Sequence, residues 1–134
     1  FEVRQPPGPG NALGEVKFMF PNPHAIYLHD TPSRNLFSHT VRAYSAGCVR
    51  LADPRGFAYA LLARQEADPV TFYHSIQRTG QQTRVSLATP IPIHLEYRTA
   101  YTSVDGRMNY RADVYGRDER LYQALIRAGV ETGA

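Results

Sequence analysis

Two residue types in this sequence could carry out covalent chemistry together, a cysteine and an upstream histidine. Cys48 is the single cysteine of the 134-residue chain, and Gly47 directly precedes it. The thiolate is the reactive form of cysteine, and a histidine within hydrogen-bonding distance can take the thiol proton and stabilise the thiolate. A glycine before the nucleophile permits a sharp turn that brings backbone amides towards a developing oxyanion. His29 and Cys48 are therefore candidates for a base and a nucleophile.

Composition leaves other interpretations of the same residues open. A free cysteine is often a buried and inert side chain. His39, nine positions before Cys48, could serve as the base in place of His29. A zinc site built from His29, His39 and Cys48 would satisfy ligand chemistry, but the spacing matches no standard zinc motif. One cysteine cannot form an internal disulfide or a cysteine-rich zinc site.

The first two thirds of the chain contain short elements that would position these residues. Residues 16–20 and 25–29 are short apolar runs ended by turn residues, which is typical of strands. Residues 33–48 are irregular, and irregular chain often carries function when a rigid scaffold holds it. Asp-Pro pairs then have the form of an N-cap followed by proline at the first helical position. They predict a helix over 54–66 and a second helix from 69 that stops at Gly80.

The last third of the chain has a β pattern followed by a helix. Apolar and polar residues alternate from Ile91 to Thr102, with the period of two that is typical of a half-buried strand. Asp105-Gly106 is a hairpin signal, and the alternation continues from Met108 to Val114 on the return strand. A helix is predicted over 118–128. Together these elements indicate a small, β-rich α+β domain with helices packed on its sheets.

The bulk composition is that of an ordinary globular domain. Hydrophobic residues make up 43% of the chain, charged residues 20%, and the formal net charge is +3. No apolar run approaches the length of about 18 residues that a membrane span needs. No nucleic-acid-binding signature is present, so the mild positive charge does not indicate such a partner. The chain begins with Phe1, so we expect its natural N-terminus to lie further upstream.

Two segments resemble the active-site signature of a known enzyme family. Residues 27–32, Tyr-Leu-His-Asp-Thr-Pro, and residues 45–50, Ser-Ala-Gly-Cys-Val-Arg, are similar to the motif of the L,D-transpeptidases. The resemblance is greatest to the large Gram-negative subgroup whose catalytic domain carries an inserted capping element. Much of the wider family has histidine where this chain has Ala46, but that subgroup also tolerates a small residue. The likeness continues, in order and spacing, through residues 7–18, 35–37, 90–93 and 105–106.

The resemblance implies a fold and a reaction. The fold would be an L,D-transpeptidase-type β-sandwich with packed helices. Residues 1–134 would form the C-terminal portion of the catalytic domain, with early strands and the capping element upstream. Cys48 would attack the L,D peptide bond of a peptidoglycan tetrapeptide stem, and D-alanine would leave. The amine of a diaminopimelate side chain would then resolve the thioester acyl-enzyme into a 3-3 crosslink.

The resemblance also implies a role for each motif residue. His29 matches the base that takes the thiol proton. The backbone amides of Gly47 and Cys48 would form part of the oxyanion hole. Tyr27 matches a position that lines the site, although a tyrosine there could equally be a core aromatic residue. Arg50 matches an arginine that orients the loop or meets a substrate carboxylate, and a purely structural anchor is the alternative.

Partners and location follow from the implied substrate. We expect peptidoglycan tetrapeptide stems as substrates, carbapenem-type β-lactams as covalent inhibitors of Cys48, no metal or cofactor, and a periplasmic location. Two other functions remain open from the sequence. One is an L,D-carboxypeptidase or another hydrolase that uses the same Cys48 and His29 site. The other is a cell-wall binding module in which Cys48 is inert.

Overall fold

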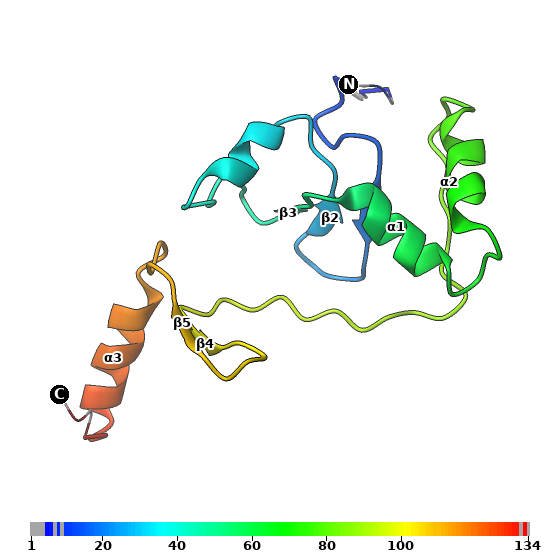
Figure 1. The fold of residues 1–134 in the computed structure, drawn as a ribbon. Helices are drawn as coiled ribbons and strands as arrows, with labels where there is room; N and C mark the ends of the chain where they lie inside the picture. Colours follow the sequence, from blue (N-terminus) through cyan, green and yellow to red (C-terminus); the bar gives the residue numbers. More distant parts are fainter. Residues whose placement is uncertain (1–4, 7, 9, 132, 134) are drawn as a thin grey trace. The chain divides into compact units, whose positions relative to one another are not determined.

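The computed structural model describes residues 5–6, 8, 10–131 and 133, and the chain forms two compact units. Unit 1 covers residues 1–90 and unit 2 covers residues 91–134. Unit 1 contains a three-stranded sheet and two α-helices, and unit 2 contains a two-stranded sheet and one α-helix (Figure 1). This composition confirms the α+β class. The two sheets lie in different units, so their packing into a sandwich stays a prediction.

The sheet of unit 1 has the strand order β1-β2-β3. Strand β1 (Lys17–Met19) is antiparallel to β2 (Tyr27–His29), and β2 is parallel to β3 (Val49–Arg50). Strands β1 and β2 lie within the two predicted runs but are shorter. The Asn22 side chain closes the connection between them, because it donates to the Ile26 carbonyl (2.7 Å) and accepts from the Ile26 amide (3.0 Å). The two-residue strand β3 is too short for periodicity to reveal, and we did not predict it.

Two helices follow the sheet and begin where the Asp-Pro signals predict. Helix α1 (Pro54–Leu62) is capped by the Asp53 carboxylate, which accepts from the Gly56 amide at 2.9 Å. Helix α2 (Pro69–Gln77) is capped in the same way by Asp68, which accepts from the Thr71 amide at 3.0 Å. The prediction that α1 extends to residue 66 was wrong, because residues 63–66 form turns that end the helix early. Helix α2 stops shortly before Gly80, which has a φ of +65°.

A short 3-10 helix, η1 (Arg34–Ser38), lies in the segment that we predicted to be irregular. The core of unit 1 is small: among the described residues, the buried apolar side chains are Leu28, Pro54, Ala58 and Leu62. The rings of Phe18 and Phe57 meet edge to face with centroids 4.9 Å apart, which places α1 against the sheet. No helix in the described part of the chain is long and apolar enough to cross a bilayer.

Unit 2 is built on the predicted hairpin. Strand β4 (Ala100–Thr102) pairs antiparallel with β5 (Met108–Tyr110). The turn between them closes through a bond from the Gly106 amide to the Ser103 carbonyl (2.9 Å), and Gly106 has the positive φ (+81°) that such a turn requires. Helix α3 (Arg117–Arg127) confirms the predicted C-terminal helix to within one residue at each end.

The segment from 91 to 99 differs from the prediction. The alternating pattern predicted a strand over the whole of 91–102, but only its last three residues form a ladder. The Arg111 amide donates to the Thr99 carbonyl at 2.7 Å, but no described backbone group pairs with 91–98, and Ile91, Ile93 and Leu95 are 41%, 39% and 51% exposed. The prediction was wrong here because alternation determines which face a side chain would occupy, whereas a strand also needs a neighbouring backbone to accept its hydrogen bonds.

A hydrogen-bonded carboxylate links the start of unit 2 to its helix. The Tyr97 hydroxyl donates to Asp113 Oδ1 at 2.5 Å, and the Asp118 amide donates to Asp113 Oδ2 at 2.7 Å. The bond from Tyr97 is the largest cause that lowers the pKa of Asp113, to about 2.

This shift predicts a pH dependence for unit 2. The pKa of Asp113 in the folded state lies below the usual value of about 3.9. Its carboxylate therefore stabilises unit 2 above about pH 4, and the contribution is lost as the pH falls towards 2. In Tyr97→Phe, the pKa of Asp113 should rise towards the usual value in a carboxyl-carbon NMR titration. The pKa of Asp105, which Ser103 and Arg107 lower, should not move. An unchanged Asp113 titration in the variant would contradict the assignment.

Candidate active site

The register between β2 and β3 places the predicted site residues on one face of the sheet. Leu28 lies opposite Val49, and His29 lies opposite Arg50 in a parallel pair. Paired residues of neighbouring strands point to the same face, and residues two apart along a strand share that face. Tyr27, His29 and Arg50 therefore share a face. Cys48, two positions before Arg50, reaches the same face if the strand geometry is continued by one residue.

His29 is buried, with 5% of its surface exposed, and its hydrogen bond fixes which nitrogen can act as a base. Its Nδ1 bonds to the backbone carbonyl of Asp30. A carbonyl oxygen can only accept, so Nδ1 carries the proton, and Nε2 of the neutral ring is the nitrogen that can take another. The Tyr27 ring meets the imidazole edge to face, with centroids 5.9 Å apart. The ring of His29 is thus held from two sides.

Cys48 is half-buried at the entry to β3. Its thiol donates to the Ala25 carbonyl at 3.9 Å rather than to His29. Ideal strand spacing puts diagonal neighbours such as His29 and Cys48 about 8 Å apart between Cα atoms. Side-chain rotation can close that gap, and catalytic hydrogen bonds often tighten only when substrate binds.

The backbone before Cys48 requires a small residue. Gly47 has a φ of +156°, and a Cβ added there would lie 3.3 Å from Ile26 Cγ1. The Gly47 amide donates to Ser45 Oγ at 3.2 Å. The sharp turn predicted from Gly47-Cys48 is therefore packed closely against the residue that precedes β2, and the Gly47 amide already has an internal partner.

The second candidate base, His39, is engaged elsewhere. Its Nδ1 lies 2.5 Å from the Tyr44 hydroxyl. The Arg50 guanidinium donates through Nη1 to the Tyr44 carbonyl at 3.1 Å, while its buried Nε has no hydrogen-bond partner. Within the described residues, His29, His39 and Cys48 form no cluster that could hold a metal ion. Of the two histidines, His29 is the one that lies in the sheet, in the strand that pairs with β3.

A buried carboxylate lies beside the candidate base, and we did not predict a role for it. Asp30 is 5% exposed and accepts from the amides of Glu15 (2.9 Å) and Thr31 (2.7 Å) and from Arg34 Nη2 (2.5 Å). Arg34 also donates to the Ala52 carbonyl at 2.7 Å, just beyond β3. Asp30 thereby connects the chain before β1, the end of β2 and the chain after β3. It belongs to the motif at 27–32, but local pattern does not reveal its contact with Glu15, which lies far before it in the chain.

An ion pair extends this network to helix α1. Arg55 donates to both carboxylate oxygens of Glu15, at 2.8 and 2.6 Å. This two-point hydrogen bond and the charge of Glu15 raise the pKa of Arg55. The helix is therefore tied to the residue whose amide binds Asp30.

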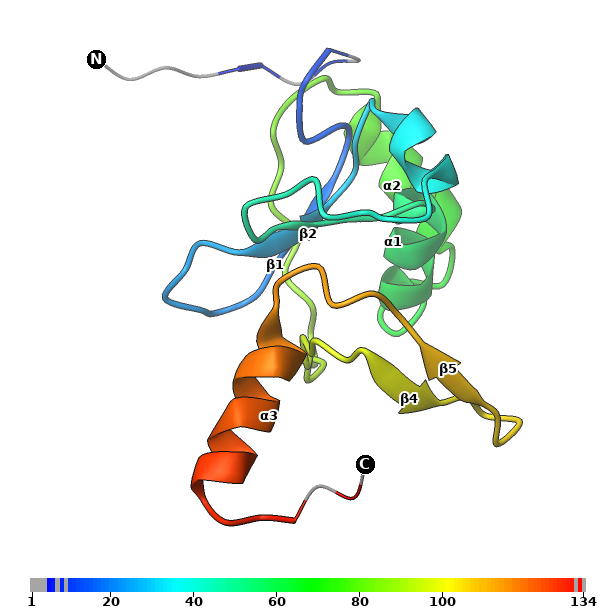
Figure 2. The same ribbon diagram turned by 90° about the vertical axis from the view of Figure 1, so that its left-hand side faces the viewer.

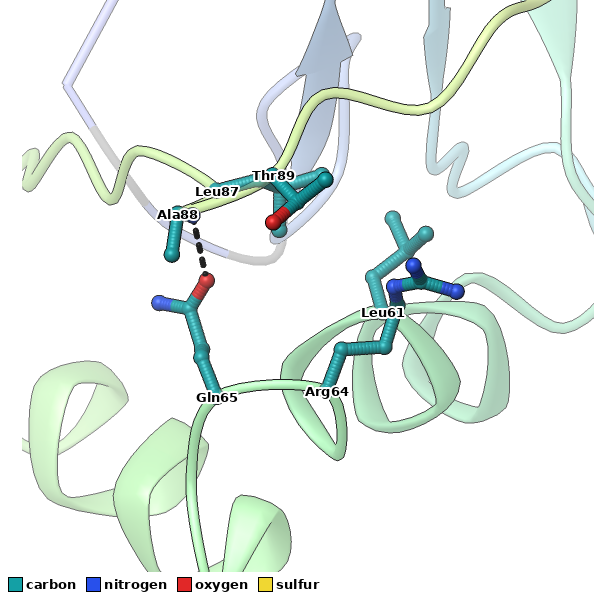
Figure 3. Close-up of a pocket in the computed structure, with 6 residues that line it drawn as sticks. All are labelled: Leu61, Arg64, Gln65, Leu87, Ala88 and Thr89. Atoms are coloured by element: carbon teal, nitrogen blue, oxygen red, sulfur yellow. Dashed lines mark hydrogen bonds between the residues drawn. The ribbon is translucent and has the colours of Figure 1, made fainter.

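A pocket in unit 1 is lined by none of these residues. It has a volume of about 300 Å³ and is lined by Leu61, Arg64, Gln65, Leu87, Ala88 and Thr89 (Figure 3). The Gln65 side chain accepts from the Ala88 amide at 2.9 Å across it. No nucleophile or base lines this pocket, so the chemistry points to the face that carries His29 and not to the pocket.

A pair of glycines tests the importance of Asp30. A Cβ at Gly14 (φ +63°) would lie 2.2 Å from Asp30 Oδ2, whereas one at Gly80 (φ +65°) would meet nothing within 4 Å. Gly80→Ala should lower the free energy of unfolding by about 1 kcal/mol because of the backbone conformation alone. Gly14→Ala should cost roughly 3 kcal/mol because Asp30 must also move. Urea unfolding measures the free energy of unfolding of both variants. Equal decreases would show that the contact with Asp30 does not contribute to stability.

Comparison with known proteins gives the family of this chain. Residues 1–93 match the L,D-transpeptidase catalytic domain family (YkuD). A protein of Haemophilus influenzae strain Rd, named "Putative L,D-transpeptidase", is 35% identical over 126 residues, which cover 94% of this chain. The chain spans about a quarter of that relative's length (25%). The match includes both motif segments, and it confirms the resemblance found in the sequence. The chain belongs to the L,D-transpeptidase catalytic domain family.

Proposed function

We propose that this chain carries the active site of a peptidoglycan L,D-transpeptidase, with Cys48 as nucleophile and His29 as base. The observation that carries the proposal is the parallel register of β2 and β3, which sets His29 opposite Arg50, two positions after Cys48. The family membership supports the reaction class. The bond from His29 Nδ1 to the Asp30 carbonyl supports the role of Nε2 as proton acceptor.

The steps follow from these two groups. His29 Nε2 takes the thiol proton, and the Cys48 sulfur forms a bond with the carbonyl carbon of the L,D peptide bond. The C–N bond to D-alanine then breaks, and His29 returns the proton to the leaving amine. An acceptor amine attacks the thioester, passes its proton to His29, and the thiol of Cys48 is released. With a diaminopimelate side chain as acceptor, the product is a 3-3 crosslink.

Three neighbours complete the proposed site. The amides of Gly47 and Cys48 would donate to the oxyanion of the tetrahedral intermediate. The Gly47 amide binds Ser45 Oγ in the structure, so it would exchange that partner for the substrate oxygen. Tyr27 would line the site beside His29. The Nε of Arg50, which lacks a partner in the structure, would donate a hydrogen bond to a substrate carboxylate.

The proposal extends to the surroundings of the site. Because peptidoglycan lies outside the cytoplasmic membrane, we propose a periplasmic location. We also propose that residues 1–134 are part of a larger β-sandwich catalytic domain. The alternating segment 91–98, whose backbone pairs with no described residue, supports this arrangement, since a sandwich would supply a neighbouring strand for its backbone and cover its apolar side chains.

Acylation by a carbapenem tests the nucleophile and the base together. Incubation of the full-length protein should add the mass of one β-lactam, and Cys48→Ala should abolish the adduct. His29→Ala should slow its formation at least about 100-fold, because the thiol loses its proton acceptor. Intact-mass spectrometry over time measures each rate. His24→Ala is the matched control, since His24 is exposed, and it should react like the parent.

Two outcomes would contradict the proposal. Absence of an adduct on the folded parent would show that Cys48 is not an activated nucleophile, and the function would then be that of a cell-wall binding module. An adduct that persists in Cys48→Ala would place the acylated group elsewhere.

Product analysis separates transfer from hydrolysis. With tetrapeptide muropeptides as substrate, we expect crosslinked dimers and free D-alanine in equal amounts, measured by liquid chromatography and mass spectrometry. Uncrosslinked tripeptides with D-alanine would instead identify an L,D-carboxypeptidase that uses the same Cys48 and His29 site.

A further inference from the structure

The loop of residues 39–47 leads directly into the candidate nucleophile, and little of the fold covers it. It joins η1 to β3, and every residue in it is exposed. Figure 2 shows this connection (cyan to teal) turning back on itself before it enters the sheet. A loop without a buried side has no apolar packing to fix it, so its conformation depends on the hydrogen bonds that its own residues make.

One side-chain pair closes this loop on itself. His39 and Tyr44 bond through Nδ1 and the phenol oxygen at 2.5 Å, and their rings meet edge to face with centroids 5.5 Å apart. The Arg42 side chain donates to the His39 carbonyl at 2.7 Å within the same loop. These contacts bring the two ends of a six-residue stretch together, so Tyr44 is held by His39.

The same tyrosine is tied to the sheet. Arg50 Nη1 donates to the Tyr44 carbonyl at 3.1 Å, and Arg50 lies in β3 opposite His29. Residues 45–48 therefore lie between two fixed points, Tyr44 and β3. The Gly47 and Cys48 amides lie in this short stretch.

We infer that His39 and Tyr44 are positioning residues for Cys48. Their contact holds the loop so that the thiol and the two amides meet the acyl donor in the reactive orientation. Neither side chain needs to touch the substrate, because the effect passes through Tyr44 and Arg50 to β3. This inference rests on the proposed function, since it concerns the same nucleophile.

A double-mutant cycle tests the inference on the full-length protein. Tyr44→Phe removes the hydroxyl but keeps the ring and the carbonyl that Arg50 binds, and His39→Leu removes the other partner. Stopped-flow acylation by a carbapenem separates initial binding from the acylation step. Each single variant should lower the acylation rate constant about tenfold, with the binding constant within about twofold of the parent. The double variant should be no slower than either single one, because both remove one shared contact.

Control measurements separate positioning from loss of structure. Tyr110→Phe alters an exposed tyrosine of unit 2 and should acylate like the parent. The thermal midpoints of the loop variants should match that of the parent. Parent-like acylation in both single variants, or losses that add in the double variant, would overturn the inference while the proposed function stands. If the parent itself is not acylated, both the inference and the proposed function fail.

Discussion

The arrangement around His29 depends on one buried carboxylate. Asp30 follows the candidate base directly, and burial of its charge is tolerable only because backbone amides and Arg34 satisfy it. Those donors are Glu15, before β1, Thr31, directly after Asp30, and Arg34, the first residue of η1. The need to satisfy one anion thus joins the chain before β1 to the stretch between β2 and η1. The ion pair between Glu15 and Arg55 then connects helix α1 to the residue whose amide binds Asp30. Little apolar surface is buried in unit 1, so this polar network has a large share in fixing the site.

The parallel pairing of β2 and β3 adds a second constraint. Parallel neighbours cannot be joined by a tight turn, so the chain must cross over between them. The crossover holds η1 and the exposed loop, and both ends of it carry site residues. Register matters here, because a slip by one residue would turn Arg50 to the opposite face from His29. Only two residue pairs form this ladder, and the bond from Arg34 to the Ala52 carbonyl helps to hold the end of β3 in place.

Local signals in the sequence predicted local structure well. The N-caps Asp53 and Asp68 and the turn at Gly106 act within a few residues, and each appears where its pattern indicates. Strand β3 and the role of Asp30 depend on partners far along the chain, which periodicity cannot reveal. The segment 91–98 shows the converse, since its pattern is that of a strand but no described backbone group pairs with it. For the site, the motif resemblance suggested Cys48 and His29 as candidates, while the register places His29 opposite Arg50.

The separation of His29 and Cys48 along the chain has a consequence for folding. Strands β2 and β3 pair only after the chain between them has closed a loop, which has an entropy cost that a tight hairpin avoids. Before that pairing, the two residues are connected only through the chain between them. Because Cys48 is the single cysteine of the chain and stands at the entry to β3, a thiol-specific probe would report on this one junction of the sheet.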